Sequence, residues 1–289
     1  MPTPISSSHN PRFKSAMKLK TSRGRRQQNK IIIFGTRESG RAIKAGVAMD
    51  ALFMHDPTRL QTDKLRTDNL RTDNLMQGET SEDNLTIQNY VAEHPDHAFL
   101  LSTELYEQLA YGDRIDQVIA VANRPELNLD QIQLSKRPLI VVLESVEKPG
   151  NIGAVVRTMD AVGADALILS DAVTDIFNPN SIRAGMGCMF GLQVVIETSQ
   201  VVKTWLLDHS INIFATIVGQ GNDYTEANFC SPSAIVLGNE ASGLSAIWQQ
   251  PQVTPIQLPM LGEADSLNVS VTSAVICYEA LRQRRNKDS

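Results

Sequence analysis

The chain has 289 residues, enough for two domains of ordinary size, and its composition of 42% hydrophobic and 20% charged residues is typical of a globular protein. It contains no run of 18 apolar residues, so the sequence predicts no membrane span, and its basic beginning lacks the apolar segment of a secretory signal. Its three cysteines lie too far apart for a disulfide framework or a zinc site, and we expect a protein of the reducing cytoplasm.

The charge of the chain is unevenly distributed. The net charge is −5, yet residues 1–30 contain eight lysines and arginines and no acidic residue, which leaves the rest of the chain at −13. A basic arm on an acidic body is typical of proteins that bind phosphate groups. Charge alone leaves a second interpretation open, in which residues 1–30 are a disordered and solvated tail.

The part of the chain that follows this arm predicts a small α/β domain over residues 31–125. A five-residue repeat at 61–75 matches neither the strand nor the helix period, and we expect it within a surface insertion at 56–96. Residues 126–137 are expected to form a linker. The predicted elements are strands at 31–35, 49–55, 97–102 and 117–122, and helices at 37–46, 85–94 and 104–111.

From residue 138 onward, short apolar runs alternate with helical patterns. The predicted elements are strands at 139–145, 166–170, 211–218, 234–238 and 254–260, and helices at 151–162, from Pro179, at 204–209 and at the C-terminus. Strands that are nearly all apolar and alternate with helices indicate a parallel sheet covered on both faces. The fold class is therefore α/β in both halves of the chain.

Several common kinds of site are absent from the sequence. The nearest match to a dinucleotide-binding glycine loop, at 185–191, has one residue too many and does not directly follow a strand, and there is no Walker loop. His94 and His97 have loose metal-ligand spacing, but Pro95 separates them and no carboxylate cluster supports them. We expect a solvated turn there and no metal.

Polar residues instead gather at the ends of three apolar strands. Asn151 lies near a helix start, with Arg157 roughly opposite the apolar stripe of that helix, and Glu240 directly follows a buried strand. Ser266 and Asn268 lie where strand-like alternation changes to helical spacing. Each residue taken singly has an ordinary explanation as a helix cap, a surface charge or a loop acid. Three such strand ends in one domain favour a common site.

At these residues the chain resembles the SpoU (TrmH-type) branch of the SPOUT RNA methyltransferases. The stretches "NIGAVVRT", "IVLGNEASGL" and "IQLPMLGEADSLNVSVTSA" are similar to the three motifs of that family and occur in the same order. The N-terminal region is similar to the substrate-binding domain of longer members, which resembles a small ribosomal RNA-binding protein. The resemblance implies a homodimer, and a deep trefoil knot in a SPOUT domain over residues 138–289.

The resemblance also implies transfer of a methyl group from S-adenosylmethionine to a ribose 2'-hydroxyl in RNA, with ribosomal RNA as the expected substrate. The implied catalytic residues are Asn151, Arg157, Glu240, Ser266 and Asn268. The implied cofactor-binding residues are Leu237, Gly238, Ile256, Leu258 and Leu267. Contacts to RNA phosphates are expected from the basic arm at Arg23, Arg25 and Arg26.

The sequence departs from the family pattern at Gly185, where the family commonly has serine, and this puts in doubt a hydroxyl contact at that position. Three other functions stay open. They are methylation of a ribose in transfer RNA, methylation of a base by a related knotted enzyme, and RNA binding without catalysis on the same fold.

Overall fold

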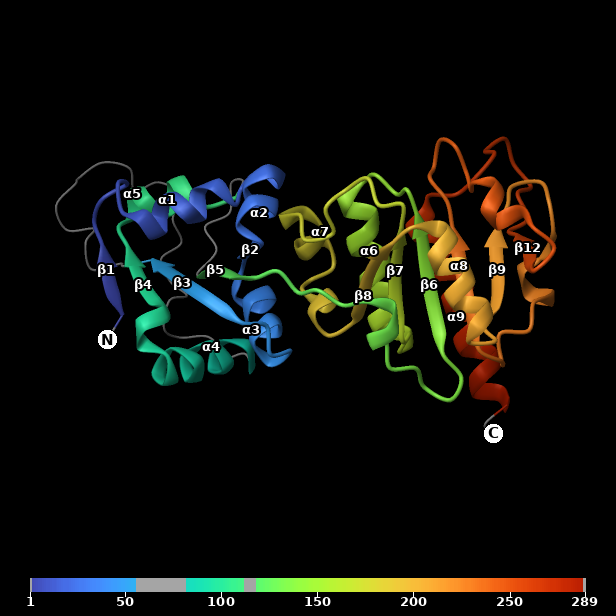
Figure 1. Cartoon of the computed structure of the whole chain (residues 1–289), viewed down its shortest axis with the longest axis horizontal. Helices are drawn as coiled ribbons and strands as arrows, with labels where there is room; N and C mark the ends of the chain where they lie inside the picture. The colour runs from blue at the N-terminus through green and yellow to red at the C-terminus, as the bar shows by residue number, and fades with distance from the viewer. Residues whose placement is uncertain (1, 56–81, 112–117, 288–289) are drawn as a thin grey trace. The chain divides into compact units, whose positions relative to one another are not determined.

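The computed structural model describes residues 2–55, 82–111 and 118–287 (Figure 1). The chain divides into two compact units, Met1–Pro125 and Glu126–Ser289. The pentapeptide repeat at 61–75 lies outside the described residues. Among the helices that the structure describes, none is long and apolar enough to cross a membrane.

The N-terminal unit is built around a five-stranded mixed sheet in the order β1-β4-β3-β5-β2, in which β5 runs antiparallel to both of its neighbours. Apolar side chains on one face of this sheet, among them Phe34, Phe53 and Leu101, pack with α1 and α5 in one core. The elements are β1 (Thr3–Ile5), α1 (Pro11–Lys18), α2 (Ser22–Gln28), β2 (Lys30–Phe34), α3 (Thr36–Lys44), β3 (Met49–His55), α4 (Glu82–Glu93), η2 (Pro95–His97), β4 (Ala98–Leu101), α5 (Thr103–Leu109) and β5 (Val118–Asn123).

Residues 1–30 do not form a separate arm, and that prediction is corrected. Strand β1 pairs with β4 at the edge of the sheet. Phe13, Ala16 and Leu19 are buried in the core of the unit, because their spacing places them on one face of α1 and its end. The end of the predicted insertion is corrected too, since α4 packs against α3 and buries Ile87.

The C-terminal unit contains a seven-stranded sheet in the order β10-β12-β9-β11-β6-β7-β8, and every pairing is parallel, as predicted. Its strands are β6 (Leu139–Glu144), β7 (Ala166–Ser170), β8 (Gln193–Glu197), β9 (Asn212–Thr216), β10 (Asn222–Asp223), β11 (Ser233–Leu237) and β12 (Val253–Gln257). Its helices are η3 (Leu129–Gln131), α6 (Pro149–Val162), α7 (Pro179–Ala184), η4 (Cys188–Phe190), α8 (Ser199–Asp208), η5 (Tyr224–Glu226), η6 (Ala246–Gln249) and α9 (Val269–Lys287).

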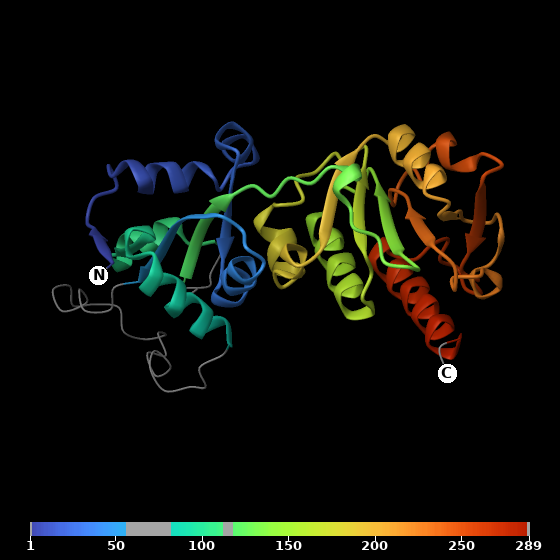
Figure 2. The ribbon, with the colours of Figure 1, turned by 60° about the horizontal axis from the view of Figure 1, so that its bottom comes forward.

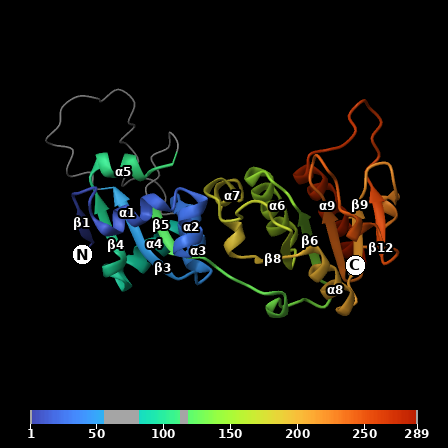
Figure 3. The same cartoon turned by 45° about the horizontal axis from the view of Figure 1, so that its top comes forward.

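Helices cover both faces of this sheet. Ile140 and Val142 of β6 share a core with Trp205 and Leu206 of α8, which lies on the opposite side of the strands from α6 (Figure 3). Helices α6 and α9 pack against each other (Figure 2). Leu129 is buried in the core beneath α8, so the predicted linker at 126–137 belongs in part to this unit.

Two glycines allow α6 and α7 to approach closely. A Cβ atom on Gly153 would lie 2.5 Å from the carbonyl oxygen of Ser181, a distance that no side chain tolerates. A Cβ atom on Gly185 would lie 3.2 Å from the carbonyl oxygens of both Gly153 and Ser181. A side chain at Gly185 would therefore require a shift of a few tenths of an ångström between α6 and the end of α7.

The far end of α9 is fixed by Arg284. Its guanidinium donates hydrogen bonds to the carbonyl oxygens of Arg137, Pro138, Phe229 and Ser231, at 2.6 to 3.2 Å. Burial lowers the pKa of this guanidinium from its ordinary value. These bonds hold α9 to the segments that lead into β6 and β11, and thereby set the position of the helix start at the other end.

Candidate active site

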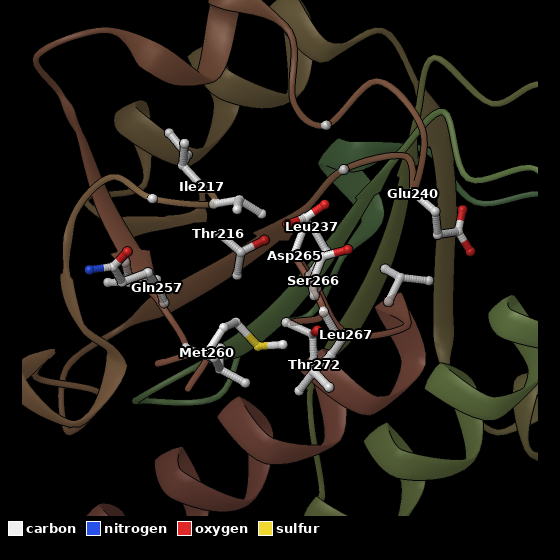
Figure 4. Close-up of a pocket in the computed structure, with 18 of the residues that line it drawn as sticks. Thr216, Ile217, Leu237, Glu240, Gln257, Met260, Asp265, Ser266, Leu267 and Thr272 are labelled. Atoms are coloured by element: carbon white, nitrogen blue, oxygen red, sulfur yellow. The ribbon is translucent and has the colours of Figure 1, made fainter. Parts of the chain in front are cut away.

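A pocket of about 800 Å³ opens at the carboxyl ends of β9, β11 and β12, where open parallel sheets commonly bind ligands. The loops that follow these three strands and the first turn of α9 line it (Figure 4). The pocket includes all five residues for which a cofactor contact was predicted, Leu237, Gly238, Ile256, Leu258 and Leu267.

The loop after β11 folds back sharply on itself. A Cβ atom on Gly238 would lie 2.5 Å from the carbonyl carbon and oxygen of Gly243, so this position requires glycine. Asn239 and Gly243 form an isolated bridge, and the Asn239 side chain accepts a hydrogen bond from the backbone N–H of Ala241 at 2.8 Å. This compact turn presents Glu240 at the rim of the pocket.

Both ends of this loop are tied to the end of β6. The Asn239 amide donates to the carbonyl oxygen of Ser145 at 2.9 Å. Glu144, whose exposed fraction is 3%, accepts from the backbone N–H and the hydroxyl of Ser245, each at 2.7 Å, and from the indole N–H of Trp248 at 2.9 Å. Its Oε1 also accepts from Ser199 Oγ at the start of α8, at 2.7 Å.

Glu144 was not among the predicted site residues. Its signal in the sequence is a single carboxylate that ends an otherwise apolar strand, a position at which a charge must be hydrogen-bonded to be tolerated. Because its partners flank the loop that lines the pocket, Glu144 positions that loop rather than facing the pocket itself.

Three of the predicted catalytic residues meet in one polar cluster. Asn151 Nδ2 donates a hydrogen bond to Glu240 Oε1, and Asn268 Nδ2 donates to Asn151 Oδ1 at 3.3 Å. They come from the first turn of α6, the loop after β11 and the residue before α9. The cluster therefore joins segments that lie 117 residues apart in the chain, at the side of the pocket where Glu240 lies.

Asn268 also caps the last helix. Its Oδ1 accepts from the backbone N–H of Ser270 at 2.9 Å, which satisfies one of the free donors at the start of α9. Asn151, in contrast, makes no cap, because α6 begins two residues earlier at Pro149. The ordinary explanation as a helix cap thus holds for Asn268 and fails for Asn151.

The remaining two predicted catalytic residues differ in position. Ser266 lines the pocket on the loop before α9. Arg157 is exposed on α6, opposite the buried side chains of that helix, as the sequence predicted, but it does not line the pocket. It makes no hydrogen bond or ion pair with any other described residue. One copy of the chain therefore does not bring this guanidinium into the pocket.

The basic residues of α1 and α2 divide into two groups. Arg25 has an exposed fraction of 1%, and its guanidinium donates to the carbonyl oxygen of Leu19 at 2.9 Å. The assignment of Arg25 to RNA binding is therefore corrected, because its guanidinium is buried and hydrogen-bonded within the unit. Lys20 likewise donates to the carbonyl oxygens of Gln108 and Ala110. Five cations on these helices are exposed, namely Arg12, Lys14, Lys18, Arg23 and Arg26. Of these, Arg12 lies over the ring of Phe99, 4.9 Å from its centroid, and the other four make no such contact with a described ring.

His94 and His97 belong to a small aromatic cluster. Their rings stack 5.5 Å apart, and the hydroxyl of Tyr90 is 2.8 Å from His97 Nδ1. Within residues 2–55, 82–111 and 118–287, no group of three or more histidine, cysteine or acidic side chains is placed to hold a metal ion.

A parallel α/β sheet, a pocket at the carboxyl ends of three of its strands and a polar cluster beside that pocket agree with the SPOUT-type methyltransferase that the sequence motifs resemble. Residues 138–278 match the model of the SpoU rRNA Methylase family. The chain belongs to this family.

The similarity to known members extends over nearly the whole chain. The 23S rRNA (guanosine(2553)-2'-O)-methyltransferase RlmP of Bacillus subtilis (strain 168) is 27% identical over 274 residues, which are 95% of this chain and 97% of that protein. A solved RNA 2'-O ribose methyltransferase is 33% identical, with a TM-score of 0.76, over 98% of this chain and 100% of that one. The SpoU methyltransferase AviRb from Streptomyces viridochromogenes, in complex with the cofactor AdoMet, is 26% identical, with a TM-score of 0.78, over 96% and 99%.

Proposed function

We propose that this protein transfers a methyl group from S-adenosylmethionine to a ribose 2'-hydroxyl of RNA, and that the RNA is ribosomal. The observation that carries the proposal is the pocket at the carboxyl ends of β9, β11 and β12, beside which Asn151, Glu240 and Asn268 are hydrogen-bonded to one another. Membership of the SpoU rRNA Methylase family and the similarity to RlmP support ribosomal RNA as the substrate.

The pocket fits the cofactor in size and in chemistry. Its volume of about 800 Å³ lies within the range of small-molecule sites, which run from about 300 to 1,000 Å³. Leu237, Ile256, Leu258 and Leu267 supply an apolar slot, and the main chain of their loops supplies donors and acceptors for a purine. When bound, S-adenosylmethionine supplies a methyl group activated by a positively charged sulfur.

The polar residues would then prepare the ribose hydroxyl. Arg157 would stabilise the negative charge that develops on the 2'-oxygen, because a guanidinium stays protonated at neutral pH and acts poorly as a base. Asn151 and Glu240 would orient the ribose through hydrogen bonds, and Ser266 and Asn268 would complete the wall of the pocket.

A homodimer would bring Arg157 to such a site. Val271 and Tyr278 lie two turns apart on one face of α9, with exposed fractions of 47% and 53%, and together form an apolar stripe. Because α6 packs beside α9, an interface on this stripe would place Arg157 of α6 close to the partner subunit. The exposure of Arg157 and its absence from the pocket of one copy support this arrangement.

The path of the last segment supports a trefoil knot. Strand β12 lies beyond β9 in the sheet, whereas α9 packs on β11 and α6. The connecting residues 258–268 pass beside the loop after β11, since both segments line the pocket.

We further propose that the N-terminal unit, which would resemble a ribosomal protein, binds RNA through Lys14, Lys18, Arg23 and Arg26. We also propose that the enzyme acts in the cytoplasm.

The proposal is tested by methylation of ribosomal RNA with labelled S-adenosylmethionine, followed by digestion to detect the nuclease-resistant dinucleotides that a 2'-O-methyl group produces.

Arg157→Ala and Arg157→Lys should lose most of the turnover and keep cofactor affinity in calorimetry. Leu267→Arg should abolish cofactor binding, because it places a charged chain in the apolar slot. Near-normal turnover of Arg157→Ala would overturn the role of that residue, and a methylated base in place of a ribose would overturn the reaction.

A further inference from the structure

We propose that Asp265 makes the pocket selective for the positively charged sulfonium of S-adenosylmethionine over the neutral sulfur of the product, S-adenosylhomocysteine. This inference rests on the proposed function. Of the described residues that line the pocket, two carry a charged side chain, Glu240 and Asp265, and both are acidic. The lining residues that the structure describes include no lysine, arginine or histidine.

The two carboxylates are not equivalent. Glu240 accepts a hydrogen bond from the amide of Asn151 and belongs to the polar cluster at the side of the pocket. Asp265 makes no hydrogen bond or ion pair with any other described residue. In Figure 4, Asp265 and Ser266 lie toward the middle of the view, between Thr216 and Leu267, and Glu240 lies at the side. Asp265 lines the pocket from the exposed loop before α9, so its charge is available to a ligand.

A lone carboxylate in a pocket with apolar walls attracts a ligand that carries positive charge. The cofactor and its product share the adenosine, the α-ammonium and the α-carboxylate, and they differ in the methyl group and the charge on sulfur. In water at low salt, a positive charge 4 Å from a carboxylate gains about fivefold in affinity, and added salt reduces this gain. Loss of the sulfonium charge on methyl transfer removes this attraction, which favours exchange of product for fresh cofactor.

The test compares three ligands on two variants by calorimetry. The ligands are S-adenosylmethionine, S-adenosylhomocysteine and sinefungin, an analogue that carries an amine in place of the sulfonium methyl. Asp265→Asn removes the charge with almost no change in shape. Glu263→Gln is the matched control, since it removes the same charge from the same exposed loop at a residue outside the pocket lining. Melting temperatures verify that both variants are folded.

At low salt, Asp265→Asn is expected to weaken the binding of S-adenosylmethionine and of sinefungin about fivefold and to leave the binding of S-adenosylhomocysteine nearly unchanged. The control should bind all three ligands as the wild type does, and the effect of Asp265 should shrink in high salt. Equal weakening of all three ligands, or none, would overturn the inference and leave the proposed function standing. A wild-type protein that binds none of the three would instead overturn the proposed function.

Discussion

Asn268 contributes both to the start of α9 and to the polar cluster, through different atoms of its side chain. Its oxygen accepts from Ser270 at the start of α9, and its nitrogen donates to Asn151 in the polar cluster. The oxygen serves stability, because it satisfies a helix donor. The nitrogen serves the site, because it holds the amide that in turn contacts Glu240.

Substitution of Asn268 should separate these two effects. Aspartate caps helices as well as asparagine but has no amide donor, so Asn268→Asp should keep the free energy of unfolding and lose most methyl transfer. Asn268→Ala should lose the cap as well, at a cost of about 1 kcal/mol in the free energy of unfolding. Chemical denaturation and a methylation assay measure the two quantities. Equal stability losses in both variants would contradict the division of roles.

Single residues also show what sequence can and cannot predict. The family resemblance placed Leu237, Gly238, Ile256, Leu258 and Leu267 in one site, and the structure brings them together in one pocket. It also grouped Asn151, Glu240 and Asn268, which are hydrogen-bonded to one another. Arg25 was assigned wrongly, because charge in a sequence does not reveal whether a guanidinium turns outward or donates to nearby carbonyls. Glu144 and Asp265 were missed, since their importance depends on which groups surround them in space.

At the scale of elements, the loop after β11 is a short segment held by a buried carboxylate. Glu144 receives hydrogen bonds from Ser245, Trp248 and Ser199, so it joins β6, this loop and α8. A buried charge with several donors is costly to alter, because the donors are left without partners.

Glu144→Gln should therefore lower the free energy of unfolding by about 1–3 kcal/mol and weaken S-adenosylmethionine binding, because an amide nitrogen would face donors. Glu197→Gln is the control, since Glu197 ends β8 and accepts from the neighbouring Thr198 rather than from the loop. Thermal denaturation and calorimetry measure the two effects. Unchanged cofactor affinity in a destabilised Glu144→Gln would show that the loop keeps its shape without this carboxylate.

The elements themselves were predictable where patterning was strong. Strands β3 and β7 match the predicted ranges residue for residue, because each is an apolar run bounded by turn residues. Strand β8 was missed, since this edge strand is short and begins and ends with polar residues. Helix α1 was missed because its charges were interpreted as a basic arm, although Asn10 and Pro11 form a standard helix start.

At the scale of the whole molecule, the proposed dimer depends on the apolar stripe of α9. Val271→Glu combined with Tyr278→Glu should convert the dimer to a monomer and abolish methyl transfer, because Arg157 would lose the partner subunit. Leu207→Glu, on α8 with a comparable exposed fraction of 39%, is the control and should change neither. Sedimentation velocity measures the association state. A wild type that sediments as a monomer with full activity would contradict the proposed interface.

RNA binding by the N-terminal unit should depend on exposed cations rather than on total charge. Replacing Lys14, Lys18, Arg23 and Arg26 with glutamine should weaken binding and reduce the slope of log affinity against log salt by roughly 1 for each phosphate that is no longer neutralised. Lys44→Gln is the control, because Lys44 already pairs with Glu82 and Asp83. Filter binding at several salt concentrations measures the slope, and an unchanged slope would remove α1 and α2 from the interface.

The order in which the chain is synthesised adds a consequence of the way the pocket is built. Its walls come from strands made in the middle of the chain, but Leu267, Val269 and Thr272 close it, and Asn268 reaches back to Asn151. A chain that is still leaving the ribosome lacks these residues and has no complete site. The site is therefore complete only after α9 has been synthesised and has packed on α6, so cofactor binding should appear late in the folding of this unit.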